Sequence, residues 1–226
     1  MTNHSNLVLD TISNRHCKRA FLDKKVPKTI IIDILDAAKN APSSKNSQPW
    51  QIEIVTDKSL EQLKHSLCKA FDQNKEQTPD YTYMTGPMPK DFKERARECG
   101  YALYDLKNIK REDQAARRAH FRENYLFFDA PMAIIFHLHA NAERGNFLDM
   151  GCFLQNILLG LETMGLGACP QFSVAGYPDT IKAQLGIEKE RLIVCGLSLG
   201  YPDKKAIINT FIPKRNSTNK LFNWHH

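Results

Sequence analysis

The spacing of apolar side chains predicts helices and strands that alternate along the chain. Apolar residues recur at helical spacing between Pro27, which opens a helix, and Pro42, which ends it. A second helix is expected to begin at Ser59, where Gln62 completes a capping box. With no internal repeat and no break in composition, the succession predicts one α+β domain over residues 1–226. Further helices are expected over residues 90–122, 147–164 and 179–185, and strands over residues 50–55, 130–138 and 191–200.

The helix expected from Phe147 to Met164 is apolar on almost every side. Such a helix must be buried all round, either in the core or against a partner subunit. Its polar residues, among them Asp149 and Asn156, argue against a membrane span.

Residues 72–89 form a segment rich in proline and polar residues, which predicts a long loop. A long loop inside a compact domain is usually functional or mobile. We expect this loop to shape the entrance of a substrate site.

The charge of the chain limits the classes of ligand that it is expected to bind. Lys and Arg number 31 against 25 Asp and Glu, a formal net charge of +6. The excess is greatest over residues 90–122, where interspersed acids argue against the continuous phosphate track of a nucleic-acid binder. A modest excess of this kind is compatible with a small anionic ligand.

The six cysteines are scattered singly, with no paired spacing typical of a metal or thioredoxin site. We therefore expect no bound metal. The first residues lack the basic and apolar regions of a signal peptide, so a cytoplasmic protein with reduced thiols is expected.

Two basic segments could bind an anion. The segment from Arg15 to Phe21 concentrates cations that would suit a phosphate, although a solvated helix end has the same composition. Lys214 and Arg215 form a second pair near the C-terminus, where a solvated tail is the simpler interpretation.

Two further segments suit a flat heteroaromatic ligand. Residues 41–50 place hydroxyl and amide side chains between a helix and a strand, and residues 165–173 combine glycines with a helix end that turns into a strand. A plain connecting loop and a simple helix stop are the alternatives.

Together and in this order, the segments resemble the FMN-dependent nitroreductase family. The sequence Pro-Ser-Ser-Lys-Asn-Ser-Gln-Pro-Trp at residues 42–50 matches the family motif, about 25 residues after a basic motif that ends in phenylalanine. Matching segments follow at residues 124–131, 149–156, 165–171 and 196–203, so the resemblance covers essentially the whole chain. It is strongest to the branch that reduces nitroaromatic compounds and nitrobenzoates.

The resemblance assigns cofactor-binding residues by position. The N-terminal FMN motif corresponds to Arg15, His16, Cys17 and Arg19, and the C-terminal phosphate contact to Lys214 and Arg215. The loop that reaches the flavin from the second subunit corresponds to Pro42, Ser43, Ser44 and Asn46, and the segment along the isoalloxazine ring to Gln171 and Phe172.

Cys17 departs from the family pattern, in which serine is common at this position. A thiol is a weaker hydrogen-bond donor than a hydroxyl, so one flavin contact is expected to be made by the backbone alone. A redox role would need a second, resolving cysteine, and none lies nearby in the sequence.

The resemblance implies an intertwined homodimer with a central, mixed but mainly antiparallel sheet flanked by helices, and with FMN sites at the subunit interface. It implies tightly bound FMN, with NADH or NADPH as the electron donor and a nitroaromatic, quinone or related aromatic acceptor. Hydride would pass through the flavin in a ping-pong cycle, so no catalytic side chain is expected. The chain also lacks the glycine-rich turn of a Rossmann dehydrogenase.

Three other classes of function are compatible with parts of the sequence. A flavin storage or sensor protein on the same fold would bind FMN with little turnover. A nucleic-acid module would use residues 90–122. A thiol enzyme would pair Cys17 with His16, but adjacent residues are seldom oriented for proton transfer.

Overall fold

The computed structural model describes residues 6–84 and 86–225. In these residues four strands form one sheet in the order β1-β2-β4-β3, and each neighbouring pair is antiparallel. This confirms the predicted α+β class and its mainly antiparallel sheet. The strands are β1 (Gln51–Thr56), β2 (Met132–Leu138), β3 (Gly167–Gln171) and β4 (Leu192–Gly200).

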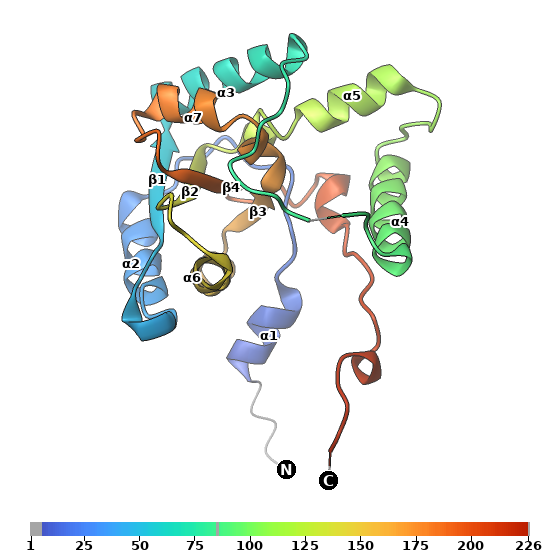
Figure 1. Ribbon diagram of the computed structural model, residues 1–226. Coiled ribbons are helices and arrows are strands. Elements are labelled where there is room, and N and C mark those ends of the chain that lie inside the picture. Colours follow the sequence, from blue (N-terminus) through green and yellow to red (C-terminus); the bar gives the residue numbers. More distant parts are fainter. Residues whose placement is uncertain (1–5, 85, 226) are drawn as a thin grey trace.

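Helices cover both faces of the sheet, as Figure 1 shows. On one face lie α2 (Lys28–Ala38) and α6 (Arg144–Thr163), and on the other α3 (Asp57–Asp72) and α7 (Pro178–Leu185). Successive residues of β2 enter opposite layers: Ile134 packs with α2 and α6, and Ile135 with α3 and α7. Burial on both faces explains why this strand is an unbroken apolar run.

The basic stretch at residues 90–122 is helical as expected and forms two helices, α4 (Lys90–Leu106) and α5 (Gln114–Arg122). Asn108 interrupts the helix with a left-handed φ of 53°, and Asp113 caps α5 by accepting a hydrogen bond from the N–H of Ala116 at 2.9 Å. Both helices lie beside the sheet layers (Figure 1). The remaining elements are α1 (Leu7–Asn14), η1 (Ser44–Asn46), η2 (Phe127–Asp129), η3 (Phe172–Gly176), η4 (Ile207–Thr210) and η5 (Thr218–Lys220).

The excursion that contains α4 and α5 returns to the place where it leaves α3. Arg122 donates from Nε and Nη2 to the carboxylate of Asp72, each at 2.9 Å. Arg118 donates to the backbone carbonyl of Phe71 at 2.8 Å. These contacts close the excursion at its base.

Two helix starts differ from the prediction. Helix α3 begins at Asp57, directly after β1, so the capping box expected at Ser59 is wrong. Helix α6 begins before Phe147, because Glu143 and Asn146 form a capping box there. The glycine at the end of α7, Gly186, confirms the predicted stop with a left-handed φ of 68°.

Helix α6 is buried on the side that faces the sheet and exposed on the other side. Phe153 and Ile157 belong to the core, whereas Leu148 is 71% exposed. The helix was expected to be buried on all sides. The described part of its own chain buries only the side that faces the sheet.

A polar cluster is buried where β1, β2 and β4 meet. Arg191 donates from Nε to His137 Nδ1 at 2.9 Å, and His137 Nε2 lies 3.3 Å from Glu53 Oε1. Burial lowers the pKa of His137 below its ordinary value, the contact with Glu53 opposes this, and the charge of Arg191 adds to it. The ring is therefore neutral at pH 7.

Within the described residues, no helix is long and apolar enough to cross a membrane, and no three acidic, histidine or cysteine side chains gather as a metal site. The first five residues, on which the expected absence of a signal peptide rests, lie outside the described part.

Candidate active site

The predicted phosphate motif at residues 15–19 lies between α1 and β3. The backbone N–H of Lys18 donates to the carbonyl of Ala168 at 3.0 Å, which holds the motif beside β3. Asn209 also holds the motif. Its Oδ1 accepts from the N–H of Arg19 at 2.7 Å, and its Nδ2 donates to the carbonyl of Ala20 at 2.7 Å. Asn209 is buried and was missed in the sequence because it lies near the other end of the chain.

The cations of this motif have two different roles. Lys18 donates to His16 Nε2 at 2.6 Å and to the carbonyl of Asn209 at 3.2 Å, while His16 Nδ1 donates to a carbonyl of α1 at 2.7 Å. Both side chains thus brace the protein itself, and the predicted contact of His16 with a cofactor stays a prediction. Among the described ion pairs none involves Arg15 or Arg19, and both charges act on the Cys17 thiol between them, so they can hold an anion at this position.

Cys17 lies between the two arginines. A hydrogen bond from the Cys169 thiol lowers the pKa of Cys17 to about 6; burial opposes this, and the charges of Arg19 and Arg15 contribute to it. The position is therefore electropositive enough to stabilise a negative charge.

The predicted flavin-contact loop forms η1 and is held against α6. The N–H of Ser44 donates to Asp149 Oδ1 at 3.3 Å. Lys45 and Asn46 have left-handed φ values of 53° and 56°, which only a well-held loop retains. Asp149 is buried, and in the described part its Oδ2 has no hydrogen-bond partner. This loop holds the predicted residues Pro42, Ser43, Ser44 and Asn46.

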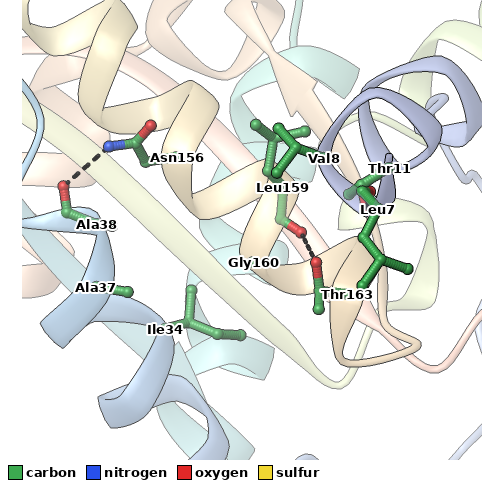
Figure 2. Close-up of a pocket in the computed structure, with 10 residues that line it drawn as sticks. All are labelled: Leu7, Val8, Thr11, Ile34, Ala37, Ala38, Asn156, Leu159, Gly160 and Thr163. Carbon is green, nitrogen blue, oxygen red and sulfur yellow. Dashed lines mark hydrogen bonds between the residues drawn. The ribbon is translucent and has the colours of Figure 1, made fainter. Parts of the chain in front are cut away.

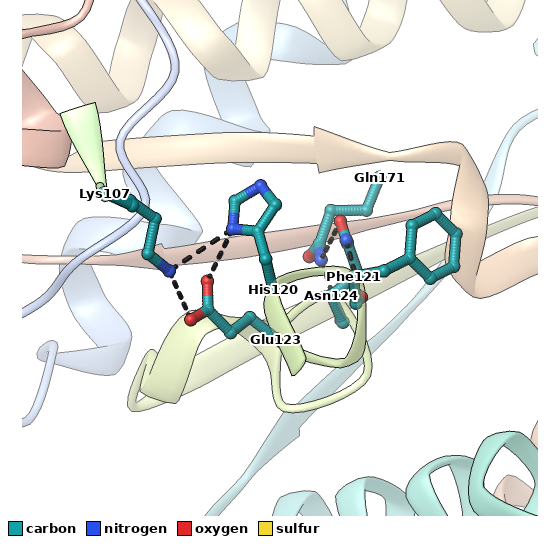
Figure 3. Close-up of polar contacts among 6 residues, drawn as sticks. All are labelled: Lys107, His120, Phe121, Glu123, Asn124 and Gln171. Carbon is teal, nitrogen blue, oxygen red and sulfur yellow. Dashed lines mark hydrogen bonds and ion pairs between the residues drawn. The ribbon is translucent and has the colours of Figure 1, made fainter. Parts of the chain in front are cut away.

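Gln171 is the last residue of β3 and Phe172 the first of η3, and the two side chains differ in exposure. Gln171 is buried and its amide donates to the carbonyl of Asn124 at 2.8 Å (Figure 3), while its own Oε1 has no partner among the described residues. Phe172 is 38% exposed. Its ring lies 4.9 Å from that of Tyr83 and 5.5 Å from that of Tyr81, so an aromatic wall surrounds the end of β3.

The 72–89 loop, of which residue 85 lies outside the described part, is anchored where it supplies this wall. Asp80 accepts from Lys182 Nζ at 2.9 Å and from the N–H of Ile193 at 2.8 Å. The Tyr81 hydroxyl donates to a carbonyl of β4 at 2.9 Å. The loop is thus fixed to the sheet at its aromatic residues, and its predicted role at a substrate entrance stays a prediction.

A second polar cluster ties the end of α4 to α5 near Gln171 (Figure 3). Lys107 pairs with Glu123, and His120 Nδ1 lies 3.3 Å from the same carboxylate. Burial raises the pKa of Glu123, but the bonds from His120 and Lys107 outweigh it and the net shift is downward. This cluster fixes the end of α5 close to the segment that Gln171 contacts.

The C-terminal pair is not brought to the N-terminal motif by the described contacts. Lys214 pairs with Glu98 of α4 at 2.9 Å, and Arg215 donates to backbone carbonyls next to it in the chain. Within one chain the predicted site residues therefore form separate groups: residues 15–19, the η1 loop, the end of β3, and the C-terminal pair.

Comparison with known proteins identifies the family of the chain. The profile of the Nitroreductase family matches residues 12–201. The chain is 33% identical over 201 residues to chloronitrobenzene nitroreductase of Comamonas testosteroni, covering 88% of each chain. It is 34% identical over 199 residues to 4-nitrobenzoate reductase of Pseudomonas putida, covering 88% of this chain and 87% of the relative.

Solved structures agree with the sequence relatives. The FMN and NADPH-dependent nitroreductase NfnB from Sphigopyxis sp. strain HMH superposes with a TM-score of 0.94 at 30% identity, covering 97% of this chain and 99% of that one. NfnB from Mycobacterium smegmatis, solved with NADPH, superposes with a TM-score of 0.93 at 28% identity over 97% and 98% of the two chains. The chain belongs to the nitroreductase family, as the motifs predicted, and the relatives named above include a chloronitrobenzene nitroreductase and a 4-nitrobenzoate reductase.

Proposed function

We propose that the chain is an FMN-dependent NAD(P)H oxidoreductase that reduces nitroaromatic, quinone or related aromatic acceptors. The observation that carries the proposal is the pair of guanidinium groups of Arg15 and Arg19, which have no carboxylate partner among the described residues and are held beside β3, just before the exposed Phe172. Its relatives are nitroaromatic reductases by name, and the superposed NfnB enzymes are FMN-dependent. The comparisons contain nothing that favours the storage or sensor alternative.

The residues present fit FMN. Arg15 and Arg19 would hold its phosphate, which carries a charge of about −1.5 to −2 at pH 7. Gln171 offers a buried carbonyl oxygen that still lacks a donor, and Phe172 offers an exposed ring for a planar group. When bound, FMN supplies the hydride and electron transfer that side chains cannot perform.

The chain's own contribution is to bind and orient planar partners. Tyr81 is fixed by its hydroxyl, and Tyr83 packs against Phe172. An aromatic acceptor would find stacking surface on this wall. No side chain is proposed as a nucleophile, and residues 72–89 are proposed to border the entrance.

We propose that a second copy of the chain completes the site. Leu7 and Val8 of α1 are 76% and 63% exposed, next to a groove of about 370 Å³ between α1, α2 and α6 (Figure 2). A homodimer that covers this groove and Leu148 would bury the exposed face of α6. It would also allow the η1 loop and the C-terminal pair to reach a partner's phosphate motif. Light scattering should then report twice the chain mass.

We also propose that residues 1–226 fold as one domain, because one sheet unites both core layers. The cytoplasmic location stays a prediction.

The cofactor proposal is tested by comparing FMN with riboflavin, which has the same ring and no phosphate. Arg19→Ala should weaken FMN binding by about 10- to 150-fold, the equivalent of about 1.5–3 kcal/mol for a charged hydrogen bond, and leave riboflavin affinity unchanged. Lys58→Ala, at an exposed position of α3, is the matched control and should change neither. Equal FMN affinity for wild type and Arg19→Ala would place the phosphate elsewhere. Bleaching of the flavin colour by NADH or NADPH under anaerobic conditions tests the reductase activity, and no bleaching with either donor would contradict it.

A further inference from the structure

The fold brings two cysteines together that are far apart in the sequence. Cys17 lies in the phosphate motif and Cys169 in β3. The hydrogen bond between the backbones of Lys18 and Ala168, 3.0 Å long, joins the neighbours of both cysteines. Each thiol lies close enough to the other to shift its pKa, and the Cys169 thiol also donates to the carbonyl of Pro170 at 3.7 Å. A second cysteine that is not evident from the sequence therefore lies beside Cys17 in the fold.

The two thiols are chemically unequal. Cys17 is partly exposed and flanked by Arg15 and Arg19, whose charges and the Cys169 bond hold its pKa low. Cys169 is only 3% exposed, and donation to Cys17 together with burial raises its pKa well above the usual range. The pair thus keeps its negative charge on the accessible sulfur and its proton on the buried one.

We propose that Cys17 and Cys169 form an oxidisable dithiol, which hydroperoxides convert into an intramolecular disulfide. In the first step the Cys17 thiolate attacks hydrogen peroxide; an S–O bond forms, the O–O bond breaks, and hydroxide leaves. In the second step the Cys169 sulfur attacks the Cys17 sulfenic acid; the S–S bond forms, the S–O bond breaks, and the hydroxyl leaves with the Cys169 proton as water. Overall, one thiolate and one thiol are oxidised to a disulfide, and one hydrogen peroxide is reduced to one hydroxide and one water.

The other cysteines lack this combination of access and activation. Cys195 is buried in the core, and burial raises its pKa to about 12. Cys68 is also buried, which raises its pKa. Cys99 and Cys152 are partly exposed, and the described contacts give neither of them a thiol partner. Oxidation should therefore select one pair.

The dithiol also shares its arginines with the cofactor site, and this consequence rests on the proposed function. A phosphate dianion bound by Arg15 and Arg19 would compete with a thiolate on Cys17 for the same charges. Bound FMN should therefore slow the oxidation of Cys17, whereas riboflavin, without a phosphate, should not.

The test uses the full-length protein, reduced, freed of flavin and desalted. After brief exposure to hydrogen peroxide, free thiols are alkylated with iodoacetamide, and unreduced peptides are mapped by mass spectrometry. The proposal expects a crosslinked peptide containing Cys17 and Cys169, lighter by two hydrogen atoms than its reduced parts. Alkylation of both residues after peroxide treatment, at the level of the untreated sample, would overturn it.

Variants separate the two sulfurs. Cys17→Ser should abolish the crosslink, and Cys169→Ser should leave a Cys17 sulfenic acid that dimedone traps. Cys99→Ser is the matched control and should give the wild-type yield. If Cys169→Ser does not fold, the wild-type map still decides the question. A disulfide of Cys169 with another cysteine in Cys17→Ser, at the yield of the wild-type crosslink, would refute the pairing.

A rate measurement adds an independent readout. At pH 6 about half of Cys17 would be thiolate against less than about 1% of an ordinary thiol, and the lower intrinsic nucleophilicity offsets part of this advantage. Iodoacetamide should therefore modify Cys17 about tenfold faster than Cys99. Equal rates would contradict an activated Cys17. Protection by FMN but not riboflavin tests only the shared arginines, so its failure is distinct from failure of the dithiol.

Discussion

The buried ion pair between Asp80 and Lys182 offers a quantitative test of how the 72–89 loop is held. The side chains are 15% and 8% exposed, and Asp80 satisfies both the Lys182 ammonium and the N–H of Ile193. Asp80→Ala removes both acceptors at once. The lysine is then left charged and largely buried, with only the carbonyl of Lys189, at 3.1 Å, as a described partner.

Removing one partner of a buried pair costs about 3–5 kcal/mol of unfolding free energy, because the remaining charge is uncompensated. In a domain of 150–250 residues each kcal/mol lowers Tm by about 2–4 °C, so a loss of about 6–20 °C is expected. Replacing both residues with apolar ones, Asp80→Leu with Lys182→Met, should recover much of this loss, because no charge is then stranded.

Urea unfolding followed by circular dichroism, at one protein concentration, measures the effect. Asp36→Ala is the matched control, since the Asp36–Lys39 pair is exposed and should contribute less than about 1 kcal/mol. If Asp80→Ala and Asp36→Ala destabilise the protein equally, the loop is not held by the buried pair and the reasoning fails.

Two further predictions follow from buried contacts. Because the pKa of His137 is lowered in the folded state, the unfolded chain takes up its proton first as pH falls below about 6.5, so unfolding free energy should decrease from there toward pH 5. His137→Gln should flatten this slope in urea titrations across the same range, and an unchanged slope would assign it to other groups. In α6, Gly160→Ala would place a methyl group 2.8 Å from Ile34 Cγ2, whereas Gly151 has open space. In the same assay, Gly151→Ala should raise the free energy of unfolding by about 0.5–1 kcal/mol. The free energy of unfolding of Gly160→Ala should be lower than that of Gly151→Ala by about 1–3 kcal/mol. Equal values for the two variants would show that the helices do not approach closely at Gly160.

The sequence predicts those parts of the fold that depend on burial and local chemistry. The run from Met132 to Leu138 identifies a strand because both of its faces are covered. Gly186 marks a helix end because the left-handed conformation there favours glycine. Ser59 misleads, because β1 passes straight into α3 and a capping pattern inside the helix has no function.

The candidate site is harder to predict from the sequence, because the residues that hold it in place come from distant segments of the chain. The phosphate motif was found by resemblance, but Asn209, which holds it, carries no local signal. Cys169 as a partner of Cys17, and Asp149 as the support of η1, likewise depend on contacts across the fold. Contacts of this kind require the three-dimensional structure.

The closure of the α4–α5 excursion has a consequence for how such a protein can diversify. The chain leaves the sheet after Tyr81, whose hydroxyl donates to β4. It is held at the end of α3 again by the hydrogen bonds of Arg118 and Arg122. Between these points α4 and α5 can vary without moving a strand, provided that the pair of Glu98 with Lys214 and the packing of α4 on η4, which carries Asn209, are kept. Residues 86–117 therefore form an exchangeable segment, and transplanting it between relatives with these contacts retained is a direct way to alter the surface beside the sheet while β1 to β4 stay in place.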